Sequence, residues 1–334
     1  MRLSDLTTPA LLVERGLLER NLAIMAEVLP GPRNRPHVKA HKCTAIARLQ
    51  RDAGHPGLTA ATVRECEGLA AAGLARDVLL ANEIVDARRL GALVEAGHRI
   101  TLAVDSEPTV EVAAAGGVRD VVIDVNVGLP RCGCDPEEAG GLADLARRRG
   151  LEVRGVMGYE GHLQAWPDDL EERRLHVEEV MRLLLRARDL VGGDLVSAGG
   201  TGTHAVNTWA GEIQAGSYAL MDSAYGKQSL PFHNALTVLA TVIHVDAKGW
   251  AVLDMGLKAH AMDHGNPDVP GGQTWFLSDE HLTYAPAEPG LVDVGDRVRV
   301  VPAHVDPTVA YHEQLWLVDG EQVIERWPVD LRGW

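Results

Sequence analysis

Between residues 35 and 216 the chain alternates short β-rich runs with helical patterns, and this alternation limits the possible folds more than any other feature. Several helical stretches end at a glycine, as at Gly73, Gly97 and Gly150, which is typical of helix C-termini. Strands that alternate with helices favour a (β/α)8 barrel, the TIM-type α/β fold, with a doubly wound open sheet as the alternative. The predicted strands are 37–38, 57–60, 77–80, 99–104, 120–125, 152–157, 194–197 and 212–214, and the predicted helices include 62–72, 86–96, 136–149 and 170–190.

The pattern of the sequence changes after about residue 230. Strand-like runs there are punctuated by glycine and proline with little helix between them, which predicts a mostly antiparallel β domain. We therefore expect a barrel over residues 26–230 and a β domain over residues 231–334, which residues 1–25 join through a strand at 9–13. The predicted strands of the β domain are 236–244, 250–253, 297–302 and 314–318.

The composition argues against several classes of function. The net charge of −15 would repel a phosphate backbone, so no nucleic-acid partner is expected. No window approaches about 18 consecutive apolar residues, so no membrane span is expected, and the first residues lack the layout of a secretory signal. Four cysteines in 334 residues do not make a disulfide framework. Together these features predict a cytoplasmic protein with reduced cysteines.

One lysine lies where barrel enzymes keep their chemistry. Lys39 belongs to the segment 35–42, at the end of the first predicted strand, and the C-terminal ends of parallel strands carry the active site in such folds. A lysine can attack a carbonyl and hold the product as an imine, and pyridoxal phosphate is the obvious carbonyl cofactor. The alternative is a solvated lysine beside two histidines, because lysines are mostly exposed.

A glycine-rich loop, residues 197–203, follows the seventh predicted strand. Its glycines let backbone N–H groups turn toward an anion, and its threonine hydroxyls add donors. In barrels the loops after strands seven and eight are a frequent phosphate site, and residues 215–218 follow strand eight. The segment therefore predicts a phosphate site, with an ordinary glycine-rich turn as the alternative.

Three further positions suggest binding chemistry. If residues 304–306 are extended, His304 and Asp306 share one face and can hold one divalent ion such as Mn²⁺, Mg²⁺ or Zn²⁺, although the pattern is weak alone. Arg131, after the fifth strand, can contact a phenolate or a carboxylate, and otherwise forms a surface ion pair. Tyr159, after the sixth strand, can stack on a ring, and otherwise is a packed aromatic.

Taken together these segments resemble the D-threonine aldolase / D-serine dehydratase family, pyridoxal-phosphate enzymes of the alanine racemase fold type. The resemblance covers nearly the whole chain, and the ordered set is far more specific than any one of its members. It is carried by residues 8–13, 35–42, 62–67, 80–83, 199–203, 216–218, 221–222, 254–258 and 304–308.

The resemblance implies a barrel plus a β domain, usually as a homodimer. It implies that Lys39 forms the Schiff base with pyridoxal 5'-phosphate and that His304 and Asp306 bind a divalent metal, so that these three are the catalytic residues. It also implies cofactor contacts from Arg131, Tyr159, Thr201, Gly202, Thr203, Gly216, Ser217 and Tyr218.

The family contains two reactions, and the metal pair bears on the choice. Its dehydratases commonly carry His-x-Cys with zinc, whereas its aldolases carry His-x-Asp with Mn²⁺ or Mg²⁺, so Asp306 favours the aldolase. The resemblance then implies cleavage of D-β-hydroxy-α-amino acids, D-threonine-like, to glycine and an aldehyde. The alternative is a D-serine or 3-hydroxy-D-aspartate dehydratase giving a 2-oxo acid and ammonia, since a hydroxyaspartate dehydratase can carry the same pair. A cofactor carrier fits less well, because such barrel proteins are usually single-domain and this chain has a second domain with a His-x-Asp pair. A racemase fits less well, because it would not need the metal pair and usually takes a tyrosine base from the second domain, where Tyr284 is a weakly placed candidate.

Some residues depart from the family pattern. His204 follows the glycine loop where an aromatic residue is expected. His162 follows the segment 159–161, and His260 and His264 add imidazoles to the second domain. These departures leave the substrate side chain open, while the cofactor prediction is unaffected.

Overall fold

A computed structural model describes residues 1–334, and the chain forms two compact units. The barrel unit consists of Met25–Lys39, Thr44–Gly216 and Leu331–Trp334. The sheet unit consists of Met1–Ile24, Ala40–Cys43 and Ser217–Asp330. Residues 217–230 thus group with the sheet unit, and a boundary between folding domains at residue 230 stays a prediction.

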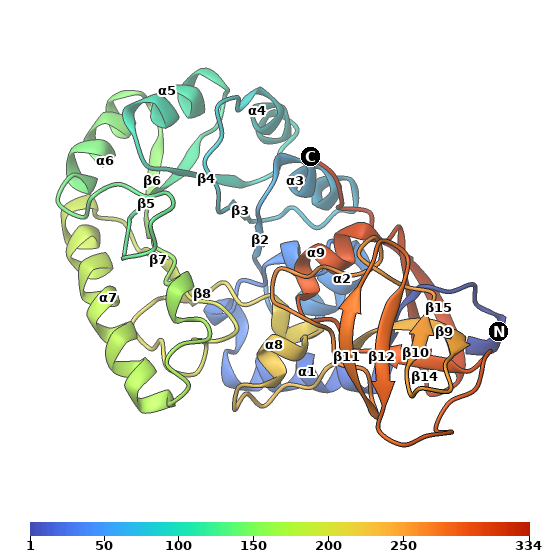
Figure 1. Ribbon diagram of the computed structural model, residues 1–334. Helices are drawn as coiled ribbons and strands as arrows, with labels where there is room; N and C mark the ends of the chain where they lie inside the picture. The colour runs from blue at the N-terminus through green and yellow to red at the C-terminus, as the bar shows by residue number, and fades with distance from the viewer. The chain divides into compact units, whose positions relative to one another are not determined.

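The barrel unit is built on seven parallel strands that neighbour one another in chain order (Figure 1). Residues 34–37 take the eighth position, because Asn34 bridges to Ile213 and His37 bridges to Thr59. The Arg35 N–H donates to the carbonyl of Ile213 over 2.8 Å, which joins this segment to the last strand. The (β/α)8 prediction is confirmed. The strands are β2 (Leu58–Ala60), β3 (Val78–Leu80), β4 (Ile100–Val104), β5 (Asp120–Asp124), β6 (Glu152–Met157), β7 (Leu195–Ala198) and β8 (Glu212–Ile213).

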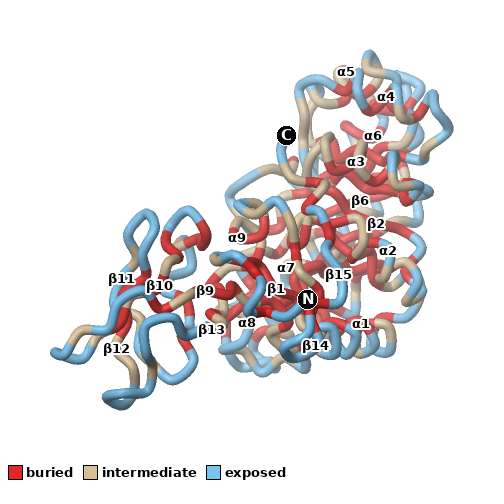
Figure 2. Tube along the Cα trace, turned by 90° about the vertical axis from the view of Figure 1, so that its right-hand side faces the viewer, coloured by how far each residue is buried: buried red, intermediate tan, exposed pale blue.

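The strands β3 and β4 form because they are largely apolar on both faces, as parallel strands covered by helices require. Every residue of β4 is buried, and Leu79, Ala103, Val122 and Met157 make a shared core. Figure 2 shows buried backbone along the barrel strands β2 and β6. The helices are α2 (Thr44–Asp52), α3 (Val63–Ala71), α4 (Arg88–Glu95), α5 (Glu107–Ala115), α6 (Ala139–Arg148) and α7 (Leu170–Val191), while α1 (Arg15–Val28) begins in the sheet unit.

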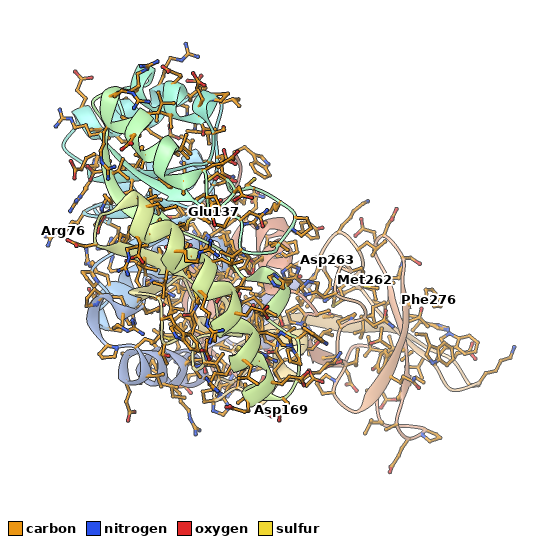
Figure 3. The ribbon with its side chains drawn as sticks, turned by 90° about the vertical axis from the view of Figure 1, so that its left-hand side faces the viewer. Arg76, Glu137, Asp169, Met262, Asp263 and Phe276 are labelled. Carbon is orange, nitrogen blue, oxygen red and sulfur yellow. The ribbon has the colours of Figure 1, made fainter.

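Local signals set the helix ends. At α3 the Thr62 hydroxyl accepts from the Glu65 N–H over 3.2 Å, and the Glu65 carboxylate accepts in return from the Thr62 N–H over 3.2 Å. At α7 the carboxylate of Asp169 accepts from the Glu172 N–H, and Figure 3 shows Asp169 at the start of this long helix. The helix ends at Gly192, whose φ of 74° suits glycine.

The sheet unit holds one mostly antiparallel sheet in the order β11-β12-β10-β9-β1-β14-β15, and β13 also pairs with β9. The strand predicted at 9–13 is β1, which pairs antiparallel with β9 and parallel with β14. The strands are β1 (Ala10–Glu14), β9 (Leu236–Val245), β10 (Ala251–Leu253), β11 (Gly272–Leu277), β12 (Leu282–Pro286), β13 (Arg297–Val300), β14 (Gln314–Asp319) and β15 (Gln322–Pro328), with short helices α8 (Ser223–Gly226) and α9 (Val305–Tyr311).

Two local predictions are wrong. The run 37–38 is not a regular strand, since His37 makes one bridge and Val38 begins a 3-10 turn over Val38–Ala40. Residues 304–306 are not extended throughout, because His304 is the N-cap of α9 and Val305 is its first residue. None of the helices is long and apolar enough to cross a membrane.

Candidate active site

Lys39 lies at the C-terminal end of the barrel strands. It occupies the 3-10 turn Val38–Ala40, directly after the bridge between His37 and Thr59. The side chain is half-buried, and the Lys39 N–H donates to Nδ1 of His37 over 3.4 Å. The lysine is therefore at the end of the barrel that carries chemistry in this architecture.

Arg131 and Tyr159 come together from the segments that follow β5 and β6. The guanidinium carbon of Arg131 lies 5.3 Å from the centroid of the Tyr159 ring, which is the distance of a cation–π contact. The two side chains border a small hollow at the same end of the barrel. Its lining is Asp124, Val125, Asn126, Val127, Leu129, Arg131, Cys132 and Tyr159.

The glycine loop after β7 is held by side chains of the barrel. The Gly199 N–H donates to Oε2 of Glu160 over 3.0 Å, and the Thr203 hydroxyl donates to Oε1 of Glu160 over 2.9 Å. The Gly202 N–H donates to Oε1 of Gln164 over 3.0 Å. A Cβ at Gly202 would lie 1.7 Å from the backbone oxygen of Gln164, so only glycine fits there. The loop is thus fixed in shape by buried acceptors.

The residues that hold this loop were missed from the sequence. Glu160 is fully buried and also accepts from Nδ2 of Asn207 over 2.9 Å. Arg173, fully buried in α7, donates to the carbonyl of Gly202 over 2.9 Å. The one available signal was a charged residue, Glu160, shortly after the predicted strand 152–157 and between Tyr159 and Gly161. Gln164 and the helical arginine carried no such signal.

His204 is part of the loop's internal structure. Its ring is buried, and Nδ1 lies 2.7 Å from the carbonyl oxygen of Thr201. Burial lowers the pKa of His204, although this hydrogen bond opposes the shift. The imidazole is therefore neutral near pH 7. His162 lies elsewhere, with its ring beside Gly128, where an added Cβ would be 3.2 Å from Cε1.

Acidic side chains gather at the ends of β3, β4 and β5. Ligand atoms of Glu83, Asp105 and Cys132 lie within 4.8 Å of one another. Burial and the neighbouring Glu83 raise the pKa of Asp124 well above its usual range, although Arg131 opposes the shift. Burial and a hydrogen bond with Glu83 raise the pKa of Cys132 to about 11. Burial and this crowding therefore favour the protonated form of Asp124.

The segment after β8 passes from the barrel unit to the sheet unit between Gly216 and Ser217. A Cβ at Gly216 would lie 2.3 Å from the carbonyl oxygen of His37, so this position also requires glycine. Tyr218 is buried, with its ring centroid 5.5 Å from that of Phe232.

In the sheet unit, His304 and Asp306 meet at the N-terminus of α9. Nε2 of His304 lies 3.9 Å from Oδ2 of Asp306, and the Ser217 hydroxyl donates to the same Oδ2 over 3.5 Å. The buried carboxylate of Asp222 accepts from the Val305 N–H over 2.9 Å, which fixes the main chain between His304 and Asp306. The side chains of His304 and Asp306 thus lie close together, although the backbone of residues 304–306 is not extended as predicted.

Further side chains surround His304. Its Nδ1 lies 2.5 Å from Oδ2 of Asp263, and its ring stacks on His264 with centroids 3.8 Å apart. Burial alone would raise the pKa of Asp263, but the hydrogen bond and charge of His304 lower it. The preceding residue, Ala303, donates its N–H to Nε2 of the buried His260 over 3.0 Å.

Comparison with known sequences decides the family. Residues 13–223 match the alanine racemase N-terminal domain, and residues 235–318 match the putative serine dehydratase domain. A D-threonine aldolase from Arthrobacter sp is 33% identical, over 99% of this chain and 94% of the relative. The chain belongs to the D-threonine aldolase / D-serine dehydratase family.

Other members of the family are similar over the full length. A 3-hydroxy-D-aspartate aldolase from Paracoccus denitrificans (strain Pd 1222) is 31% identical, over 99% of this chain and 93% of the relative. A D-threo-3-hydroxyaspartate dehydratase from Delftia sp. (strain HT23) is 29% identical over 99% of both chains. The crystal structure of D-threonine aldolase from Filomicrobium marinum superposes with a TM-score of 0.92 at 31% identity, covering 100% of this chain and 98% of that one.

The donor sets of this member of the D-threonine aldolase / D-serine dehydratase family fit the groups that the family uses. The 3.9 Å between Nε2 of His304 and Oδ2 of Asp306 is just within the span of two metal–ligand bonds of about 2.0–2.2 Å each. In the barrel unit a lysine amine lies at the C-terminal end of the strands, the same end as the Arg131–Tyr159 pair and the hollow that it borders. These features suit a divalent ion and a phosphorylated carbonyl cofactor, respectively.

Proposed function

We propose that this chain is a pyridoxal-phosphate- and divalent-metal-dependent aldolase that cleaves D-β-hydroxy-α-amino acids to glycine and an aldehyde. The observation that carries the proposal is the imidazole–carboxylate pair of His304 and Asp306, 3.9 Å apart, in a chain whose full-length relatives include two aldolases. A carboxylate is a hard ligand that suits Mn²⁺ or Mg²⁺, with Zn²⁺ as the alternative.

In this proposal the barrel unit binds the cofactor. Lys39 holds it covalently through its amine, and Arg131 and Tyr159, already in contact with each other, position its ring. Pyridoxal phosphate, when bound, supplies an electron sink for the carbanion that forms at Cα. The other residues proposed to contact the cofactor are Thr201, Gly202, Thr203 and Gly216 of this unit, together with Ser217 and Tyr218, which follow Gly216 in the chain.

His304 and Asp306 hold the metal in this proposal. The divalent ion, when bound, lowers the pKa of the substrate's β-hydroxyl. A base of this chain takes the hydroxyl proton, and a histidine is the usual group for that task near neutral pH. The Cα–Cβ bond then breaks, Cβ leaves as the aldehyde carbon, and Cα takes up a proton to give glycine.

The dehydratase is the second candidate, because one full-length relative has that activity. Among the solved structures is a cysteine variant of this dehydratase in its metal-free form. The present chain has Asp306 two residues after His304, where the dehydratases of the family commonly have cysteine, and this favours the aldolase.

A product assay separates the two reactions. Cofactor-loaded protein with Mn²⁺ would be given a panel of D- and L-β-hydroxy-amino acids, with and without EDTA. Glycine and aldehyde from D-substrates only, lost with EDTA and restored by Mn²⁺, are expected. A 2-oxo acid and ammonia would replace the aldolase by the dehydratase, and no product from any substrate would reject both.

A matched pair of histidine variants places the metal. His304→Ala should lose the Mn²⁺-dependent activity, whereas His244→Ala, an exposed histidine of β9, should keep it. A homodimer and a cytoplasmic location are also proposed. Light scattering of the purified protein and fractionation of cells that produce it test these two points.

A further inference from the structure

We propose that Asp263 is a positioning residue for the metal pair: it holds the imidazole of His304 through Nδ1 and so directs Nε2 to the ion. The inference rests on the proposed function only in taking His304 and Asp306 as metal ligands. It assigns a role to a residue in the loop between β10 and β11, labelled in Figure 3.

The hydrogen-bond geometry supplies the first step. Oδ2 of Asp263 lies 2.5 Å from Nδ1 of His304, which is hydrogen-bonding distance. An ionised carboxylate only accepts hydrogen bonds, so Nδ1 must carry the proton. A neutral imidazole carries a single N–H, so Nε2 is left with its lone pair exposed for a metal.

The second step is the direction in which Nε2 points. It lies 3.9 Å from Oδ2 of Asp306, whereas the contact with Asp263 is made by the other ring nitrogen, Nδ1. The contact that fixes the tautomer therefore also aims the free nitrogen at the other proposed ligand. Metal-binding histidines in general are oriented in this way by an acceptor at the second ring nitrogen.

The third step concerns what Asp263 alone contributes. The main chain around His304 is already fixed, because Ala303 donates to His260 and Val305 donates to Asp222. The ring of His264 stacks on one face of the imidazole at an interplanar angle of 7°. Rotation of the ring about its own bonds is the freedom that remains, and the Asp263 contact restricts it.

A rival interpretation uses the same residues as a metal site of their own. Ligand atoms of Asp263, His264 and His304 lie within 4.8 Å of one another. An ion bound between Oδ2 of Asp263 and Nδ1 of His304 would make a bond of about 2.0–2.2 Å to each atom. The observed 2.5 Å between the two atoms is too short for this unless the ion lies far off the line between them. The hydrogen bond is therefore the favoured interpretation.

The test is a binding measurement that needs no turnover. Mn²⁺ would be titrated into metal-free, cofactor-loaded protein, and free Mn²⁺ would be followed by its electron paramagnetic resonance signal. Asp263→Ala should weaken Mn²⁺ binding by about 10- to 100-fold, the usual effect of removing such a partner. Asp263→Asn keeps an oxygen acceptor and should recover much of that loss. Asp268→Ala, which removes an exposed carboxylate from the same loop, should bind as the unmodified protein does.

Two results would overturn the inference. In the first, the Mn²⁺ affinity of Asp263→Ala stays within a factor of about two of that of the unmodified protein, while His304→Ala does not bind. This result would show that the contact has no positioning role. A loss in His264→Ala equal to that in Asp263→Ala, with an altered spectrum of bound Mn²⁺, would show direct ligation. Thermal unfolding and the visible cofactor band confirm that each variant is folded. A protein that follows the expected affinities but makes a 2-oxo acid would refute the aldolase and keep this inference.

Discussion

Charged side chains are arranged differently at the two ends of the barrel. At the N-terminal end every buried charge has a partner: Nε of Arg35 lies 2.7 Å from Oε1 of Glu212, and Nη2 lies 2.9 Å from Oδ2 of Asp77. Arg154 adds a second cation, 3.0 Å from Oδ1 of Asp77. At the C-terminal end Glu83 and Asp124 crowd together instead, and burial with this crowding raises the pKa of Asp124.

This difference separates stability from chemistry. Because the buried charges at the N-terminal end are paired, removal of a partner leaves a buried charge without compensation. The other end has a lysine, a loop that requires glycine and a carboxyl group, Asp124, whose pKa is raised, which is typical of functional sites. Substitutions at the two ends should therefore fail in different measurements.

The largest effect is expected at the C-terminal end. Lys39→Ala should lower activity at least about a thousandfold, roughly 4 kcal/mol of barrier, because the covalent link to the cofactor is lost. It should also abolish the visible band of the lysine-bound cofactor, while the free energy of unfolding changes little. Lys39→Arg keeps the charge and should fail equally. A retained band in either variant would contradict the role of Lys39.

The second effect belongs to the N-terminal end. Arg35→Ala leaves Glu212 and Asp77 without their shared cation and should lower the free energy of unfolding by about 3–5 kcal/mol in urea titrations. Variant protein that stays folded should make the same products. The control is Arg182→Ala, whose i,i+4 partner Glu178 lies on an exposed helix face and contributes only about 0.3–0.5 kcal/mol. Equal losses in the two variants would remove the contrast between buried and surface pairs.

The parts of the fold that depend on local sequence patterns could be predicted from the sequence. Alternating runs gave the barrel strands and the position of Lys39, and the Thr62–Glu65 spacing fits the start of α3. The hairpin of β11 and β12 was missed, since no residue of β11 is buried and its pattern lacks an apolar face.

Contacts between distant parts of the chain were beyond local patterns. The Val305 N–H donates a hydrogen bond to the carboxylate of Asp222, 83 residues away in the chain, and Val305 begins a helix there. The backbone is therefore not extended as expected. Glu160 holds Gly199, 39 residues away, so its role depends on a fold that places β6 beside β7. The site residues themselves stay predictions until variants are measured.

A smaller effect tests how the C-terminal end keeps its shape. Glu160→Gln replaces one acceptor oxygen by an NH₂ group, which cannot accept from Gly199, Thr203 and Asn207 together. We expect a loss of about 1–3 kcal/mol in local stability, seen as weaker pyridoxal-phosphate binding in absorbance titrations. Glu137→Gln, on an exposed pair with Arg186, is the matched control (Figure 3). Unchanged cofactor affinity in Glu160→Gln would mean that the loop does not depend on this carboxylate.

The smallest effect is a change in the pH dependence of stability, and the two ends should differ in where it occurs. At the C-terminal end, burial lowers the pKa of His204, so the unfolded chain takes up a proton below about pH 6.5 that the folded chain refuses. The stability of the folded state is then lost as pH falls below this value. At the N-terminal end, burial alone would raise the pKa of Asp77, but Arg35 and Arg154 lower it. The ionised carboxylate therefore stabilises the folded state above about pH 4, and this contribution is lost as pH falls further. Urea titrations at a series of pH values should show a shallower slope between pH 7 and 5 in His204→Gln, and below about pH 4 in Asp77→Asn. If each variant changed the slope in the other's range instead, the assignment of these two groups would fail.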